Sequence, residues 1–190
     1  MVIDRLLPNS SVPQVSVDHY KGARDATNLL LKACRFPPVM LTGPESATSS
    51  TPRYQGYCDA LAEQGLHPTA IRVQMGDYTY ESGYRGMIRL LRDQHKKPLD
   101  GVFAANDLSA MGALRAIRDA GYRCPDDIRL VGFDDIEATR YVFPSLTTIR
   151  QPMDCIATVA VEMLLALNNG EEVAERMVLL PGELVRRESC

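Results

Sequence analysis

Short apolar runs alternate with longer amphipathic segments along the whole chain. The apolar runs predict buried strands at 15–17, 39–41, 71–75, 101–104, 128–133, 146–149, 176–180 and 184–187. The amphipathic segments place apolar residues at helical spacing and predict helices at 22–33, 53–64, 81–94, 107–120 and 154–168. Strands that alternate with helices of this length are typical of an α/β fold with parallel sheets flanked by helices.

Polar residues follow several of the predicted strands directly. In parallel sheets ligands bind at the carboxyl ends of the strands, so these polar residues are the candidates for a binding site. They are Asp4, the segment Ser49–Arg53, the segment Gly76–Tyr78, the pair Asn106-Asp107 and the pair Asp134-Asp135.

The chemistry of these residues suits a small polar ligand. The carboxylate of Asp134 accepts two hydrogen bonds, as a vicinal diol offers them, and Arg53 presents a fork of donors. Asn106 both donates and accepts, and the Tyr78 ring stacks on a sugar face or a base. The sequence leaves other interpretations open: Asp107 as a helix N-cap, Asp135 as a turn residue, and Asp134 with Arg53 as a structural ion pair.

Motifs for catalysis and for metal binding are absent from the sequence. It contains no GxSxG, GxxxxGK[ST] or HExxH pattern, and the loop 43–48 has no lysine for a phosphate. The three histidines, His19, His67 and His95, are dispersed, and we expect them on the surface. We therefore expect no enzyme, no metal site and no cofactor.

Composition narrows the choice of partner and compartment. The 190 residues carry 21 Lys and Arg against 24 Asp and Glu, a net charge of −3, which argues against DNA binding by this chain alone. No apolar run reaches the ~18 residues of a membrane span, and no signal-peptide region precedes residue 15. The five cysteines lie far apart without a CxxC pair, which predicts reduced thiols in a cytoplasmic protein.

Several segments, in their order and spacing, resemble the LacI/GalR family of regulators over essentially the whole chain. The most specific is 102–114 (VFAANDLSAMGAL), followed by 120–127, 131–135, 144–152 and 183–189. Earlier matches are 3–5, 17–18 and 53–57, and the segments 76–78 and 81–84 are similar to the purine repressor branch. The position of the family's usual Gly-His carries Cys34 and its neighbours instead, a difference that we expect to be structural.

The resemblance implies a periplasmic-binding-protein-like fold of type I, with two α/β lobes joined by three crossovers. The crossovers fall near 17–18, 149–152 and 179–181. Residues 18–150 and 180–190 would form a nearly complete C-terminal lobe. Residues 1–17 and 153–178 would be remnants of an N-terminal lobe, and the helix-turn-helix that binds DNA would be absent from this chain.

The resemblance also assigns roles to the strand-end residues. Asp134 and Arg53 would be the main effector ligands, Asn106 and Asp4 would add hydrogen bonds, and Tyr78 would stack. Ser49 would lie on the rim of the cleft. The implied function is allosteric control of DNA binding by a small polar metabolite, either a sugar or a nucleoside or purine.

The family also implies partners for the protein, and two alternative functions have to be compared with it. The protein would be a homodimer or higher homo-oligomer and would reach operator DNA only through the missing N-terminal domain. The alternative is a periplasmic-type sugar-binding protein for transport, which the absent signal and the cysteines disfavour. An enzyme of Rossmann type lacks its phosphate fingerprint here.

Two expectations depend on the incomplete lobe and on the site. The apolar stripe Ile156, Val159, Met163 and Leu167 would have lost its partners, so we expect another copy, a rearrangement or residues outside the chain to bury it. We also expect alanine at Asp134 or at Arg53 to abolish effector binding with little loss of fold.

Overall fold

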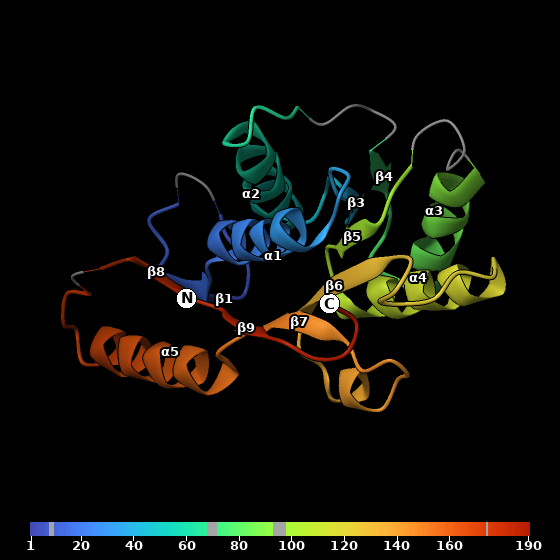
Figure 1. Cartoon of the computed structure of the whole chain (residues 1–190). Coiled ribbons are helices and arrows are strands. Elements are labelled where there is room, and N and C mark those ends of the chain that lie inside the picture. The colour runs from blue at the N-terminus through green and yellow to red at the C-terminus, as the bar shows by residue number, and fades with distance from the viewer. Residues whose placement is uncertain (8–9, 68–71, 93–97, 174) are drawn as a thin grey trace.

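The computed structural model describes residues 1–190 except 8–9, 68–71, 93–97 and 174, and its strands form two sheets (Figure 1). The large sheet has the order β4 (Val73–Met75), β3 (Val39–Thr42), β5 (Gly101–Ala104), β6 (Arg129–Asp134), β7 (Thr147–Arg150) and β9 (Glu183–Val185). The small sheet has the order β1 (Val2–Ile3), β2 (Gln14–Val17) and β8 (Met177–Leu180). All neighbours are parallel except β7 and β9.

Helices cover both faces of the large sheet, which confirms the predicted α/β fold. One face carries α1 (His19–Ala33) and α2 (Ser50–Ala62), and the other carries α3 (Tyr80–Arg92) and α4 (Asp107–Asp119). Successive residues of a strand point to opposite faces. In β5, Phe103 therefore packs in the α1–α2 core, whereas Val102 and Ala104 pack in the α3–α4 core.

Helices α3 and α4 approach each other closely because glycine lies at their contact. A Cβ atom built on Gly112 would lie 2.0 Å from the carbonyl oxygen of Tyr80. Only a residue without a side chain lets the two backbones come this near. The contact sets the start of α4 beside the β4–α3 loop, which carries Tyr78.

Helix α5 (Met153–Asn168) packs on the small sheet of its own chain, so the expectation for its apolar stripe was wrong. Ile156 is 1% exposed and Met163 6%, both in one core with Val15 and Val17 of β2. The small sheet supplies the partners that we expected to be missing. Val159 is partly buried, Leu167 is 40% exposed, and the remaining apolar residues of the helix that face solvent are Met153, Val161, Leu164 and Leu165.

The chain passes between the two sheets at three segments: β2 to α1, β7 to α5, and β8 to β9. The division into two lobes at these points remains a prediction. Two short elements were not predicted, β1 and the 3₁₀ helix η1 (Glu137–Arg140), because so few residues show no periodicity. The predicted strand start at Ile71 and helix end at Gln94 lie outside the described residues.

Candidate functional site

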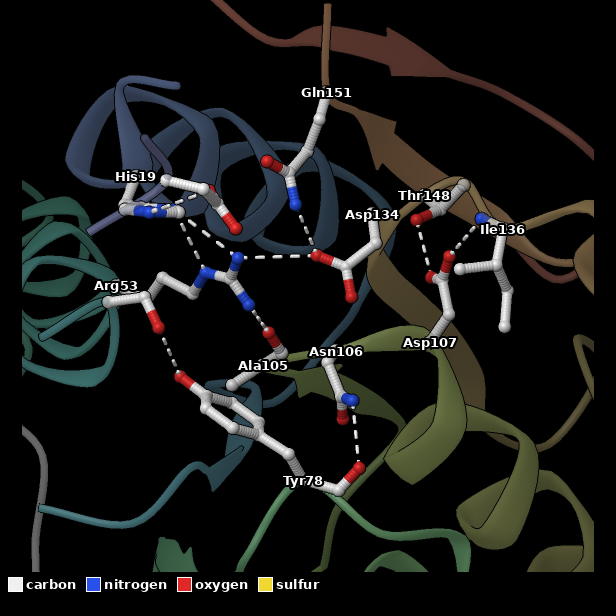
Figure 2. A network of polar contacts seen from close by, with 12 residues as sticks. His19, Arg53, Tyr78, Ala105, Asn106, Asp107, Asp134, Ile136, Thr148 and Gln151 are labelled. Carbon is white, nitrogen blue, oxygen red and sulfur yellow. Dashed lines mark hydrogen bonds and ion pairs between the residues drawn. The ribbon is translucent and has the colours of Figure 1, made fainter. Parts of the chain in front are cut away.

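Several of the predicted site residues lie in one network of polar contacts, and Figure 2 shows Arg53, Tyr78, Asn106 and Asp134 in it. Arg53 comes from the first turns of α2, and Asp134 is the last residue of β6. Asn106 follows β5, Tyr78 follows β4 and Asp4 follows β1. Four of the six predicted site residues thus end or follow a strand, and the other two, Ser49 and Arg53, lie at the start of α2.

Arg53 and Asp134 form an ion pair at the centre of this group. The Arg53 Nη2 atom lies 3.2 Å from Asp134 Oδ1, and Arg53 Nη1 donates to the carbonyl of Ala105. The guanidinium stacks 3.8 Å from the centroid of the Phe133 ring. The structural ion pair that the sequence left open is therefore present, and its arginine is only 4% exposed.

A second donor reaches the Asp134 carboxylate from the β7–α5 segment. Gln151 Nε2 donates to Asp134 Oδ1 at 2.8 Å. Burial raises the pKa of Asp134, and the charge of Arg53 and the hydrogen bond from Gln151 act against that rise. Burial thus favours the neutral form of Asp134, and these two neighbours favour its charged form.

His19 belongs to the same cluster, so the expectation that it lies on the surface was wrong. It is 3% exposed, and its Nδ1 atom lies 3.3 Å from Arg53 Nε and 3.2 Å from Arg53 Nη2. Burial and the positive charge of Arg53 lower its pKa to about 3, which makes the ring neutral at physiological pH. His67 is exposed, as expected, and His95 lies outside the described residues.

The capping role that the sequence offered for Asp107 belongs to its neighbour Asn106. Asn106, not Asp107, caps α4, because its side chain accepts from the backbone N–H of Ser109 at 3.1 Å. Asp107 is the first helical residue, and its carboxylate accepts from Thr148 Oγ1 at 2.6 Å and from the Ile136 N–H at 2.9 Å. Burial raises the pKa of Asp107 to about 7.

Tyr78 is fixed by both its ends. Its hydroxyl shares hydrogen bonds with Ser49 Oγ at 3.0 Å and Ser50 Oγ at 2.8 Å, and Asn106 Nδ2 donates to its carbonyl at 2.8 Å. The ring covers Gly43, where a Cβ atom would lie 2.1 Å from it. The ring therefore packs against the β3–α2 loop, with the Arg53 guanidinium 5.7 Å from its centroid.

Asp135 does more than turn the chain. It is buried, and it pairs with Arg150 at 2.7 Å and with Arg187 at 2.6 Å. Its carboxylate thus has different ionic partners from that of Asp134, which pairs with Arg53. The triad ties the residue beside the site to the β7–α5 crossover and to the last segment of the chain.

Backbone conformation marks the same positions. Among the described residues other than glycine, positive φ angles occur at Asp4 (57°), Tyr78 (67°), Asp134 (119°) and Asp135 (58°). Such conformations cost about 1–3 kcal/mol each and gather at ligand sites. Three of the four are residues that the sequence proposed for ligand contact.

The sequence analysis did not propose two residues of the cluster, His19 and Gln151. Gln151 directly follows β7, and His19 is the first residue of α1, two residues after the end of β2. The strand-end rule that identified the other candidates could therefore have found them.

The described residues hold no group of three or more His, Cys, Asp or Glu that could bind a metal ion. The five cysteines are free, and burial raises the pKa of Cys34 and of Cys124 to about 12. In the part of the chain that the structure describes, no helix has the length and apolar character to cross a membrane.

Comparisons with known proteins agree with the α/β fold of the chain. A family model described as a periplasmic binding protein-like domain matches residues 28–190. The HTH-type transcriptional regulator CelR of Thermobifida fusca is 32% identical over 183 residues, 96% of this chain and 53% of CelR. The solved CelR–cellobiose complex has a TM-score of 0.92 at 32% identity, covering 100% of this chain and 58% of that one.

A second solved structure, the Lac repressor dimer bound to operator and the anti-inducer ONPF, has a TM-score of 0.88 at 29% identity. The match covers 99% of this chain and 56% of the repressor chain. The chain thus spans about half the length of the curated relatives that it matches.

Proposed function

Because the chain belongs to the LacI family of transcriptional regulators, through their periplasmic binding protein-like domain, we propose that it is the effector-sensing part of such a regulator. The effector is a small polar metabolite, a sugar or a nucleoside or purine. It binds among Asp134, Arg53, Asn106, Tyr78, Asp4 and Ser49. The observation that carries the proposal is the convergence of Arg53 and Asp134 at the carboxyl ends of the strands.

The position of the site gives effector binding a mechanical consequence. Asp134 and Arg53 belong to the large sheet with its helices, whereas Asp4 follows β1 of the small sheet and Gln151 lies in a crossover. An effector that bonds to both groups draws the two lobes together. Since it binds the closed arrangement better, it shifts the population toward that state, which is how effector and operator binding become coupled.

The remaining parts of the regulator follow from its relatives, which are regulators and not enzymes. CelR is named an HTH-type regulator, and the Lac repressor was solved on its operator. We therefore assign operator binding to a helix-turn-helix domain of the whole protein, outside these residues. A protein of this function works in the bacterial cytoplasm, where its operator lies.

An exposed aromatic surface supports assembly into a homodimer. Tyr141 is 77% exposed and Phe143 84%, beside a groove of about 470 Å³ that Met111 and Leu114 of α4 help to line. Large exposed aromatic residues next to an apolar groove are typical of protein interfaces. Phe143→Asp should leave the far-UV spectrum unchanged and shift the sedimentation coefficient to that of a monomer. A native chain that is monomeric at high concentration would contradict this part.

The sensing function is tested by a thermal-shift screen of sugars, sugar acids, nucleosides and bases, followed by calorimetric titration of the compounds that stabilise the chain. Asp134→Asn removes a charge-assisted acceptor worth about 1.5–3 kcal/mol and should weaken binding roughly 10–100-fold. The control Asp126→Asn changes an exposed turn aspartate and should leave the affinity unchanged. Equal affinity of the native chain and Asp134→Asn would refute the site.

A further inference from the structure

The guanidinium of Arg53 is held by protein acceptors along both of its hydrogen-bonding edges. Nε and Nη2 face His19 Nδ1 at 3.3 and 3.2 Å, while Nη1 and Nη2 face the Ala105 carbonyl and Asp134 Oδ1. A guanidinium has five N–H donors, and a carboxylate or phosphate is recognised by two parallel donors along one edge. With both edges occupied, Arg53 has one N–H on Nη1 left to donate and no free fork.

His19 is the residue that occupies the first of these edges. Arginine only donates, so the Nδ1 atom of His19 accepts and carries no proton, and the ring proton lies on Nε2. The Nε2 atom faces Ser16 Oγ at 3.4 Å and Asp4 Oδ1 at 4.0 Å. The ring itself is held against Phe133, with 5.8 Å between ring centroids. His19 is thus a neutral, buried acceptor built into the wall beside Arg53.

The groups left for a ligand are mostly acceptors. Asp134 Oδ1 receives both Arg53 and Gln151, so Oδ2 has no donor among the described residues. Gln151 Oε1 is buried and has no hydrogen-bond partner in that part of the chain. The Asp4 side chain is half exposed. The cluster thus sets two carboxyl groups, Asp4 and Asp134, beside one guanidinium and a neutral imidazole.

We propose that His19 is a positioning residue that holds Arg53 against the protein, so that the site selects neutral, hydroxyl-rich effectors and excludes those that present a carboxylate or phosphate to it. This inference rests on the proposed function and names the charge class of its effector. An anionic group would meet two carboxylates and an arginine without a free fork. Like-charge contact of this kind is a strong means of rejecting a wrong partner.

The test uses pairs of compounds that differ in one oxidised or phosphorylated carbon. They are D-glucose and D-glucuronate, D-galactose and D-galacturonate, and uridine and uridine 5′-monophosphate. In calorimetric titrations of the native chain, the neutral member of any pair that binds should bind at least about tenfold more tightly. A charged member that binds as tightly as its neutral counterpart would overturn the inference.

Variants of His19 separate positioning from simple structural support. His19→Ala frees one edge of Arg53 and should reduce the preference for neutral compounds at least about threefold. His19→Asn keeps a side-chain acceptor and should retain most of it. His67→Ala, at an exposed histidine, is the matched control and should behave as the native chain. An unchanged preference in folded His19→Ala would contradict the role of His19.

A measurement on Arg53 itself distinguishes failure of this inference from failure of the proposed function. In the native chain the ¹⁵N signal of Arg53 Nε should not move on titration with sodium acetate or inorganic phosphate, and in His19→Ala it should shift and saturate. A saturating shift in the native chain would overturn the inference whether or not any sugar binds. If no neutral or charged compound binds while the acetate result is as expected, the proposed function is what fails.

Discussion

Replacement of Arg53 by methionine tests how far the cluster supports the fold as well as the site. The change keeps an unbranched side chain of similar length and removes the guanidinium. Asp134 then loses its charged partner, and the Ala105 carbonyl and His19 Nδ1 lose their donors. From the sequence alone we expected little loss of fold. The burial of the guanidinium, which is 4% exposed, changes that expectation.

The expected magnitude follows from these contacts. Breaking a buried ion pair by removing one partner costs about 3–5 kcal/mol. The Asp134 side chain is a quarter exposed, which favours the lower end of that range. Each orphaned buried acceptor adds about 1–3 kcal/mol, less when neighbours share the loss. We expect Arg53→Met to lower the free energy of unfolding by roughly 4–6 kcal/mol, a large part of the ~5–15 kcal/mol of an ordinary domain.

The assay is urea unfolding followed by circular dichroism at 222 nm, because the chain has no tryptophan. The double variant Arg53→Met with Asp134→Leu removes the unpaired charge and should recover roughly 2 kcal/mol of the loss. Arg115→Met, at an exposed ion pair on α4, is the control and should leave the midpoint unchanged. A loss below about 1 kcal/mol for Arg53→Met, or a double variant less stable than the single one, would refute the reasoning.

Three further outcomes are expected from the midpoints of urea unfolding, and the first two concern their dependence on pH. The pKa of His19 falls from 6.5 to about 3 on folding. Relative to His19→Asn, the free energy of unfolding of the native chain should therefore fall by about 1.4 kcal/mol per pH unit between these two values as the pH is lowered. Parallel pH profiles of the two proteins would contradict this expectation. The pKa of Asp107 rises to about 7 on folding. The stability that its protonated carboxyl group contributes is therefore fully present below about pH 4 and is lost as the pH rises to 7. A native chain that gains stability over Asp107→Asn between pH 4 and 7 would be the opposite result. Gly112→Ala should lower the free energy of unfolding by at least about 2 kcal/mol because its Cβ atom meets the Tyr80 carbonyl. The control Arg118→Ala, on the exposed side of α4, should leave the urea midpoint unchanged. Equal midpoints of the two variants would argue against the close contact of α3 and α4.

Much of the fold could be predicted because the sheet core imposes a local pattern. Residues 102–104 alternate between two cores, and α4 carries its apolar residues at helical spacing. The strand and the helix could therefore be predicted from their own residues, without knowledge of what they pack against. Helix α5 was different. Its stripe was recognised, but periodicity does not say which element a stripe meets, and the small sheet that covers Ile156 includes a β1 strand of two residues.

The site was predictable where chemistry follows a strand end and not where burial changes a residue's role. Asp134 and Tyr78 were proposed because they follow apolar runs, and Arg53 because it opens a helix after a Ser/Thr-rich loop. His19 was placed on the surface because a lone histidine carries no periodic signal. Its burial and the charge of Arg53, 34 residues away, lower its pKa and keep it neutral. Asn106 and Asp107 are both capping residue types, so the sequence could not say which of the two caps α4.

The structure of the chain with its most tightly bound neutral compound tests the central claim most directly. The account predicts that hydroxyl groups of the compound lie within hydrogen-bond distance of Asp134 Oδ2 and Gln151 Oε1, with Arg53 still bonded to His19. A compound that binds elsewhere, for example in the groove beside Phe143, and contacts neither Asp134 nor Arg53 would contradict it.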